Sequence, residues 1–481
     1  MILLPPATAL SGVEQFGLDI LIDLSRLLPA HRPLSEEIVR LELSDREPEF
    51  LDLKGCAARD WYFRRAEGVV SVPRAVLGFI GGIAGAVAEQ KTHAADKHGR
   101  VPSLEAPVVV AGVERQAVIS RAGKALREAV VASAQRRPVR LVTPWPEARR
   151  WAVALTHDLD LVSLWPLAAG ARVVELARRG RLGLALNAAA HALLAIGSNP
   201  VWRGVQAVLA PEGNFSARST WFVICETPTL KTVFSADVTY RPESDAARRI
   251  FRDIMGRAEI GLHGSFATST GDGVFERQRD RLTGLTSQSP SGIRQHFLRL
   301  RPDSTPAKMR AAGFHYDSSY GFSDRNGFRL GVADVVPLWD AARGERVGME
   351  EAPFCWMDRA LSKYQAVEDP GAWVDDGLEL ATETRLVDGV WVGVWHPNIH
   401  PSLGFPGATV AFERLLAEIA AHHPFFASLS TIVHWRAARR AVRATAIAPD
   451  GSVQADGPAG AHFPLFLEDA QAHRLELVRT Q

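Results

Sequence analysis

The chain has 481 residues, of which 47% are hydrophobic and 23% charged, and its 55 basic and 54 acidic side chains give a formal net charge of +1. This length favours two or three domains, and the composition is typical of a globular protein with a sizeable core. The balanced charge argues against the basic surface of a nucleic-acid-binding protein. Three cysteines are too few for a disulfide framework and match no zinc module.

Three segments bear on membranes and localisation. The N-terminal stretch is apolar, but two prolines interrupt it and no basic region precedes it, so we expect no signal peptide and a cytoplasmic protein. Leu182–Gly197 contains polar side chains and is interpreted as a buried or amphipathic helix, so no transmembrane segment is expected. The basic run Arg436–Arg443 is expected to be a solvated surface, with weak contact to an anionic membrane as the alternative.

In chain order, residues 1–150 mix helical and short strand patterns without a chemical motif, and Ala106–Ala111 is predicted to be a buried strand. From Trp151 onward, apolar runs alternate with amphipathic helical stretches. The predicted strands are Ala152–Thr156, Ser219–Ile224, Ala258–Leu262, Gly292–Leu298, Asp334–Trp339 and Val390–Trp395, and the helices include Ser244–Arg257, Phe275–Thr286, Ser304–Ala312, Ala372–Thr384 and Phe412–His422. Such alternation predicts an α/β domain with a parallel sheet, either open or closed into a barrel.

Two segments depart from this alternation. Residues 161–215 are rich in Ala, Leu and Arg and helical in pattern, which predicts a helical insertion after the first strand. Residues 441–481 contain short alternating runs around the turn signal Pro449–Gly451, which predicts a small C-terminal β appendage. The expected organisation is therefore an N-terminal α/β region of unknown role at 1–150, a barrel-like domain at 151–440 and a short β-rich tail.

The sharpest chemical signal is an apolar strand that ends in Asp158 and Asp160. In an extended chain these two carboxylates point to one face, whereas His157 points to the other. Two adjacent carboxylates repel each other unless a metal ion or a proton lies between them. The pattern therefore favours a metal ligand beside a general base, and an Asx turn that caps the next helix is the structural alternative.

Three further strand ends carry basic or imidazole side chains: His263, the pair Arg294 and His296, and His396. If the parallel strands form one sheet or barrel, their carboxyl ends meet at one mouth. Asp and His ligands suit zinc and similar divalent transition metals rather than calcium. His400 lies in the loop after His396 and is expected to be structural or exposed to solvent.

These motifs, taken in order, resemble the polysaccharide deacetylase superfamily (carbohydrate esterase family 4, chitin-oligosaccharide-deacetylase-like) over about residues 151–440. The matching segments are Thr156-His-Asp-Leu-Asp160, Ser219-Thr-Trp-Phe-Val223, Glu259-Ile-Gly-Leu-His263, Arg294-Gln-His-Phe297, Gly313-Phe-His-Tyr-Asp-Ser-Ser319 and Val394-Trp-His396. The resemblance implies a distorted (β/α)7 barrel and a metal-dependent deacetylase.

The resemblance also implies a role for each matched residue. Asp158 would be the general base, Asp160 and His263 metal ligands, Arg294 the residue that orients the base, and His396 the general acid. The family's second motif has another histidine four residues after the first, whereas this chain has Ala267 there.

Either the metal therefore takes a different third ligand, or the site is weak or inactive. His296 is the preferred candidate, because it ends the next strand, and His157 is the second choice. The predicted cofactor is a divalent metal, with zinc favoured.

Three functions remain open at this stage. The first is removal of N- or O-acetyl groups from a carbohydrate, in the biosynthesis or modification of a surface polysaccharide. The second is hydrolysis of a small non-sugar amide, and the third is a non-catalytic carbohydrate-binding or scaffold protein that kept the barrel. A pocket lined by aromatics such as Trp356, Trp395 and Trp435 would favour a sugar, whereas clustered arginines would favour an anionic small molecule.

Overall fold

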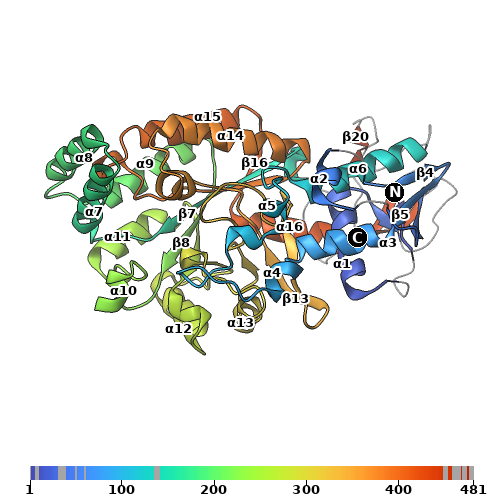
Figure 1. Cartoon of the computed structure of the whole chain (residues 1–481), viewed down its shortest axis with the longest axis horizontal. Helices are drawn as coiled ribbons and strands as arrows, with labels where there is room; N and C mark the ends of the chain where they lie inside the picture. Colours follow the sequence, from blue (N-terminus) through green and yellow to red (C-terminus); the bar gives the residue numbers. More distant parts are fainter. Residues whose placement is uncertain are drawn as a thin grey trace.

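The computed structural model describes residues 2–5, 10–30, 39–48, 51–58, 61–134, 141–447, 453–457, 467–468 and 474–475. Two sheets with their helices form the two ends of an elongated molecule (Figure 1). Among the described residues, no helix is long and apolar enough to cross a membrane.

A curled, ten-stranded sheet forms the larger end of the molecule, in the order β12-β13-β11-β10-β9-β8-β7-β15-β14, and β16 also pairs with β7. Its strands are β7 (Ala152–Leu159), β8 (Thr220–Ile224), β9 (Glu259–Gly264), β10 (Gly292–Gln295), β11 (Tyr316–Asp317), β12 (Val336–Asp340), β13 (Glu345–Glu351), β14 (Trp356–Met357), β15 (Val390–Val394) and β16 (Phe425–Phe426). All neighbours are parallel except the hairpin of β12 and β13. This confirms the expected α/β class, and the sheet of the expected distorted barrel is curled into a half-barrel.

Amphipathic helices connect these strands, namely α11 (Asp245–Ile254), α12 (Val274–Thr286), α13 (Thr305–Ala311), α14 (Pro370–Leu386) and α15 (Ala408–Ala420), and a further helix, α16 (Leu429–Ala441), follows β16. In α11 the side chain of Ser244 caps the helix by accepting from the Ala247 N–H. Apolar residues spaced three and four apart, such as Ile250 and Ile254, then face the core.

Three helices fill the segment between β7 and β8: α7 (Trp165–Arg178), α8 (Leu182–Leu194) and α9 (Pro200–Asn214). They lie at the end of the molecule farthest from the N-terminal sheet (Figure 1). The segment is helical, as the sequence predicted. α8, however, is neither buried nor amphipathic, because most of its large apolar side chains are exposed.

The smaller end of the molecule is built around a second sheet in the order β18-β17-β2-β1-β3-β5-β4. The strands are β1 (Ile2–Leu3), β2 (Pro29–Ala30), β3 (Val39–Ser44), β4 (Arg64–Ala66), β5 (Val69–Pro73), β17 (Arg443–Ile447) and β18 (Val453–Asp456), packed with α1 (Gly12–Ser25), α3 (Arg74–Ala84) and α6 (Val118–Ser133). The short strands expected in the tail are present, and they extend this sheet instead of standing alone, because Ala444 of β17 pairs with Ala30.

The remaining short strands form a third sheet, in which β19 (Leu467–Glu468) lies between β6 (Leu141–Val142) and β20 (Arg474–Leu475). The predicted turn at Pro449–Gly451 lies outside the described residues. Both tail pairings join the end of the chain to its first 150 residues.

Two predicted strands differ in the structure. The prediction for Ala106–Ala111 is wrong, because the segment forms the short helix α5 (Pro107–Val110). A run of valines cannot distinguish a strand from a buried helical turn, and Pro107 at the first helical position favours the helix. The strand predicted for Gly292–Leu298 ends at Gln295, after which residues 296–298 make a tight 3-10 turn that places His296 at the edge of the sheet.

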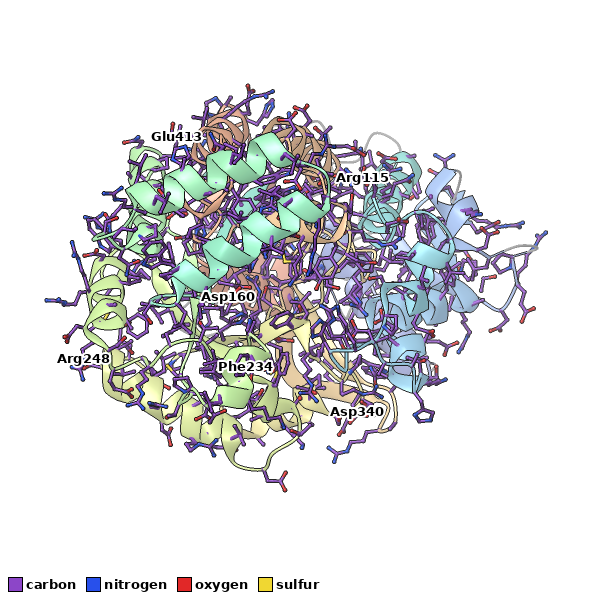
Figure 2. All side chains as sticks on the ribbon, turned by 60° about the vertical axis from the view of Figure 1, so that its left-hand side comes forward. Arg115, Asp160, Phe234, Arg248, Asp340 and Glu413 are labelled. Atoms are coloured by element: carbon purple, nitrogen blue, oxygen red, sulfur yellow. The ribbon has the colours of Figure 1, made fainter. Side chains whose placement is uncertain are left out.

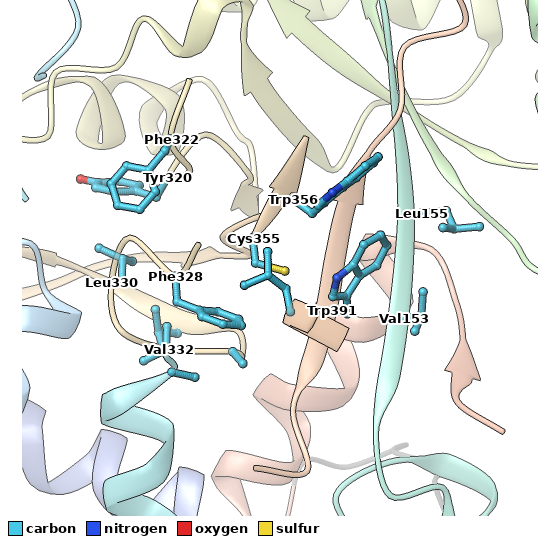
Figure 3. Packing of buried hydrophobic residues seen from close by; sticks show 14 of the residues in the cluster. Val153, Leu155, Tyr320, Phe322, Phe328, Leu330, Val332, Cys355, Trp356 and Trp391 are labelled. Atoms are coloured by element: carbon cyan, nitrogen blue, oxygen red, sulfur yellow. The ribbon is translucent and has the colours of Figure 1, made fainter. Parts of the chain in front are cut away.

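The core beside β7 contains stacked tryptophans. Trp356 and Trp391 lie between Val153 of β7 and Phe328 of a long loop (Figure 3), and their ring centroids are 5.9 Å apart. Trp356 and Trp435 are each 1% exposed, and Trp395 is 3% exposed. These three residues are part of the core and do not line the candidate cavity, whose aromatic lining residues are instead Phe297 and Tyr364.

The basic run in α16 is buried rather than exposed, so the interpretation as a solvated surface or membrane contact is wrong. Arg436 makes ion pairs of 2.9 Å with Asp23 and 2.7 Å with Asp334. Arg440 is paired with Asp23 at 3.0 Å and with Glu350 at 2.8 Å. Helical spacing brings these arginines onto a face that packs on α1 and the main sheet, where carboxylates neutralise them.

Candidate metal and catalytic site

Four parallel strands bring the candidate residues together at one mouth of the main sheet. Asp158 lies near the end of β7 and Asp160 directly after it, whereas His263 of β9 is the register partner of Arg294 in β10. His396 follows β15, which pairs with β7 on its other side. The carboxyl ends of adjacent parallel strands share one edge, so residues distant in sequence converge there.

Asp160, His263 and His296 form the centre of the site. The Asp160 Oδ1 atom lies 3.3 Å from His263 Nε2 and 3.5 Å from His296 Nε2, and the three potential ligand atoms all lie within 4.8 Å of one another. Asp160 Oδ1 is buried without a hydrogen-bond partner in the described structure. A buried oxygen without a donor, facing two imidazole nitrogens, fits a divalent cation.

Both imidazoles are oriented from behind. His263 Nδ1 lies 2.9 Å from the carbonyl oxygen of Arg294, which can only accept, so Nδ1 carries the proton and Nε2 keeps its lone pair. His296 Nδ1 lies 3.3 Å from the carboxylate of Asp237, which favours the same tautomer. Such partners are typical of metal-ligating histidines. Asp237, in the loop before α11, was missed from the sequence, because no strand-end pattern marks it.

The carboxylates make this centre electrostatically favourable for a positive charge. Burial would lower the pKa of His263, but the charges of Asp158 and Asp160 outweigh burial and raise it. Burial would raise the pKa of Asp160, but the imidazoles, His296 first, outweigh it and lower the pKa. The centre therefore holds an ionised carboxylate that attracts a cation.

Asp158 is held on one side of this centre by Arg294. Burial would raise the pKa of Asp158, but Arg294, whose Nη1 donates to Asp158 Oδ1 at 2.9 Å, outweighs it and lowers the pKa. Asp158 Oδ2 remains directed at the centre, 3.7 Å from His263 Nε2. Arg294 itself is fully buried and donates to Ser318 and Thr156.

His396 lies on another side of the centre and is held by Asp358. Its Nδ1 is 2.6 Å from Asp358 Oδ1, and its backbone N–H donates to Asp358 Oδ2 at 2.7 Å. Burial would lower the pKa of His396, but Asp358 and then Asp160 outweigh it and raise the pKa. Its Nε2 faces Asp160 Oδ2 at 3.7 Å. Asp358 follows β14 directly, so a strand-end carboxylate was a signal that the sequence analysis left unused.

The two other histidines considered from the sequence lie outside the centre. His157 is fully buried behind β7, with Nδ1 2.8 Å from the carbonyl oxygen of Trp395 and Nε2 2.7 Å from Glu212, so it is not the third ligand. Strand alternation turned it away as expected. His400 Nδ1 accepts from the Ser402 N–H at 3.2 Å, which confirms a structural role.

A cavity of about 350 Å³ opens onto Asp158, Asp160, His263 and His396. Its walls differ in character. Arg100, Arg359 and Lys363 supply cations, whereas apolar residues of the helical insertion and of α10 (Leu230–Phe234) line another part: Leu161, Leu164, Leu167, Ala168, Ala171 and Val233. Burial, followed by the charge of Arg359, lowers the pKa of Lys363 to about 8. The cavity thus combines a metal-type centre with a cationic wall and an apolar wall.

Comparisons with known proteins gave matches among solved structures. No family model and no curated protein matches the chain. A protein assigned as a polysaccharide deacetylase from Mycobacterium smegmatis is 22% identical, with a TM-score of 0.41, over 63% of this chain and 96% of that one. The peptidoglycan deacetylase PdaC from Bacillus subtilis is 11% identical, with a TM-score of 0.30, over 62% of this chain and 95% of that one.

A third match is the carbohydrate esterase family 4 domain of a multidomain xylanase from the hindgut metagenome of Trinervitermes trinervoides. It is 9% identical, with a TM-score of 0.31, over 60% of this chain and 91% of that one. At this level of similarity, the geometry of the site itself has to support any function. In its motifs and among solved structures, the chain is similar to the polysaccharide and peptidoglycan deacetylases.

Proposed function

We propose that this protein is a metal-dependent hydrolase that removes acetyl groups from a carbohydrate. One observation carries the proposal: an Arg294-held carboxylate and an Asp358-held imidazole both face the cluster of Asp160, His263 and His296. Acyl transfer to water needs a base, an acid and stabilisation of the developing oxyanion around one carbonyl carbon.

Asp160, His263 and His296 would hold the ion. A bound divalent ion at this centre, with zinc favoured by the Asp and His donors, would polarise the acyl carbonyl and lower the pKa of the attacking water. In this proposal His296 is the third ligand, in place of the histidine that the family has at the position of Ala267. It reaches the centre from a neighbouring strand instead of from the turn after β9.

Asp158 acts as the general base in this proposal. Arg294 holds Oδ1 and keeps the carboxyl group ionised, so that Oδ2 is free to accept a proton from the water that attacks the acetyl carbon. Arg294 cannot itself act as the base, because its guanidinium stays protonated. Its burial between Phe222 and Phe354 fixes its position.

His396 acts as the general acid. Asp358 raises the pKa of His396 and orients the ring, so that a protonated Nε2 faces the centre. When the bond from the acetyl carbon to the sugar nitrogen or oxygen breaks, Nε2 donates its proton to that leaving atom. The proton taken by Asp158 and the proton given by His396 keep the reaction balanced.

Hydrolysis of a small anionic amide is the second candidate. It is favoured by Arg359 and Lys363 in the cavity wall, which would bind a carboxylate or phosphate group, whereas the third cation of that wall, Arg100, is already paired with Asp96 at 2.6 Å. Both candidates use the same centre and differ only in substrate. A role in surface polysaccharide formation and a cytoplasmic location remain predictions.

Elemental analysis of the purified protein tests the proposal first. We expect about one zinc or similar ion per chain in the wild type and its loss in Asp160→Ala and His296→Ala. His422→Ala, at an exposed position, is the matched control and should keep the ion. Failure of the wild type to bind any divalent metal after reloading would overturn the proposal and favour the non-catalytic alternative.

Acetate release then tests the substrate class. An N-acetylated oligosaccharide should yield acetate with the wild type and not with Asp158→Asn. Release of acetate or another acid only from small anionic amides would favour the amidase instead.

A further inference from the structure

The end of the molecule that carries α7, α8 and α10 exposes many large apolar side chains. Leu194 of α8 is 80% exposed, Leu186 is 73% exposed and Phe234 of α10 is 87% exposed. The complete set of exposed large apolar residues in this region is Leu167, Val174, Leu182, Leu186, Leu193, Leu194, Ile196, Phe215, Leu230 and Phe234. We call this set the apolar rim. A concentration of this kind on one end marks an interaction surface.

The sequence of α8 explains why the rim lacks the usual polar covering. From Leu182 to Trp202 no side chain is acidic, lysine or arginine, and Leu182, Leu186 and Leu193 share one helical face that is exposed. Surface helices of globular proteins normally present charged residues on that face. Among the described contacts α8 packs mainly on α7, and its outer face has no protein covering.

The rim is continuous with the candidate active site. Leu164, Leu167 and Ala171, in α7 and directly before it, line the cavity, and so does Val233 of α10. Leu167 belongs both to the cavity lining and to the rim. Figure 2 shows Asp160 between the α7–α8 pair and Phe234, so the cavity opens within the apolar surface.

The charges beside the rim are basic. Arg178, Arg181 and Lys231 are exposed, whereas no acidic residue occurs in residues 182–203 or 227–236. The nearby Glu175 is paired with Arg172 at 2.9 Å and with Arg179 at 2.6 Å. Exposed leucines and phenylalanine bordered by Arg and Lys are the composition of surfaces that lie in the interface of an anionic bilayer.

We propose that the apolar rim docks onto the surface of an anionic lipid bilayer and that the cavity receives an amphiphilic, lipid-linked carbohydrate from it. The substrate part rests on the deacetylase function proposed above. A protein partner on this surface would close the cavity, whereas a bilayer covers the rim and also presents substrate. Leu164 and Leu167 would contact the lipid chain of such a substrate.

The cationic wall suits the remaining part of this substrate. Lys363 lies over the ring of Phe297, and Arg359 lies over the ring of Phe405. No carboxylate makes an ion pair with either of them among the described residues. A phosphate group between sugar and lipid would supply the missing negative charge.

Vesicle flotation with the full chain tests the docking. The wild type should float with vesicles of phosphatidylcholine and phosphatidylglycerol, and more weakly with phosphatidylcholine alone. The double variant Leu186→Glu/Leu193→Glu and the single variant Phe234→Glu should each bind about tenfold more weakly or worse. Val410→Glu, at a 69% exposed position on α15, is the matched control and should bind as the wild type does.

Several outcomes would overturn the docking proposal. Absence of wild-type flotation, or equal loss in the Val410→Glu control, would exclude a lipid surface. So would a dimer in solution that the Leu186→Glu/Leu193→Glu variant dissociates, because the rim would then cover a second copy of the chain.

Activity separates this inference from the proposed function. With a water-soluble acetylated oligosaccharide, the rim variants should keep wild-type kcat, since none of the changed residues lies at the metal-type centre. With the same sugar on a lipid anchor in vesicles, they should show a raised KM. Vesicle binding without any acetate release would preserve the docking and refute the deacetylase. Acetate release with no preference for the anchored sugar would refute the lipid-linked substrate.

Discussion

Two buried clusters of ionisable side chains in this molecule, one around Asp23 and one around Asp160, serve different ends. Around Asp23, the arginines of α16 and the carboxylates pair with one another, and the pairs join α1 and the main sheet. Around Asp160, partners hold the two imidazoles from behind and leave Asp160 Oδ1, His263 Nε2 and His296 Nε2 within 4.8 Å of one another. Burial of charge alone therefore does not mark a site; what marks it is donor atoms left facing a shared, accessible space.

The largest expected effect is at the general base. Asp158→Asn should lower kcat by about 10⁴-fold, because an amide cannot accept the proton of the attacking water. Steady-state acetate release measures this. Metal content should stay within the wild-type range, since Asp158 is not one of the three proposed ligands.

Asp272→Asn, at a fully exposed carboxylate, is the matched control and should leave kcat unchanged. If Asp158→Asn retained most of its activity, Asp158 would have a structural role, as Asp23 does, and would not be the general base.

The second prediction concerns the Asp23 cluster. Asp23→Asn should lower the free energy of unfolding by about 3 kcal/mol, because it leaves Arg436 and Arg440 buried with less compensating charge. Urea denaturation followed by circular dichroism measures this. Asp45→Asn, at an exposed carboxylate paired with Arg74, should change stability by less than about 0.5 kcal/mol.

The same residue gives a pH dependence of stability. Burial would raise the pKa of Asp23, but Arg436, Arg440 and Arg439 outweigh it, so the folded-state pKa lies below the ordinary value of 3.8. The stability from Asp23 is therefore complete above pH 3.8 and is lost as the pH falls below it. In Asp23→Asn this acid-side loss should be smaller. If Asp23→Asn lost as much stability at acid pH as the wild type does, other carboxylates would be the main cause of that loss.

The third prediction concerns His396, the proposed general acid. Asp358→Asn should lower kcat by about 10- to 100-fold, because His396 loses its orienting carboxylate. The same change removes the main charge that raises the pKa of His396. His396 donates a proton only below its pKa, so the alkaline limb of the kcat profile should move to lower pH. A loss of kcat without this movement would indicate a purely structural role for Asp358.

The smallest effect is expected at Asp237, which orients the proposed third ligand, His296. Asp237→Asn should weaken metal binding by about tenfold, because an amide orients His296 less firmly than a carboxylate does. Competition with a chelator measures the affinity. Unchanged affinity would mean that His296 needs no support from Asp237, and together with metal retention in His296→Ala it would move the third ligand elsewhere.

Local patterns in the sequence predicted much of the main sheet and of the candidate centre. The apolar runs at β7, β8, β9, β10 and β15 marked the strands, and their polar ends marked Asp158, Asp160, His263, Arg294 and His396. This worked because strand alternation and the shared edge of a parallel sheet follow from backbone geometry. Alternation alone also turned His157 away from the centre.

Other features depended on contacts between distant segments. Asp358 and Asp237 gained their roles only where the fold placed them behind His396 and His296. The tail strand β17 joined the N-terminal sheet. The basic run of α16 was buried against Asp334, which is 102 residues from Arg436, and against Asp23, which is 417 residues from Arg440. The sequence by itself determined which residues could end a strand with useful chemistry. The tertiary structure decided which charges neutralise each other and which remain open to a ligand, because that depends on partners that no local pattern contains.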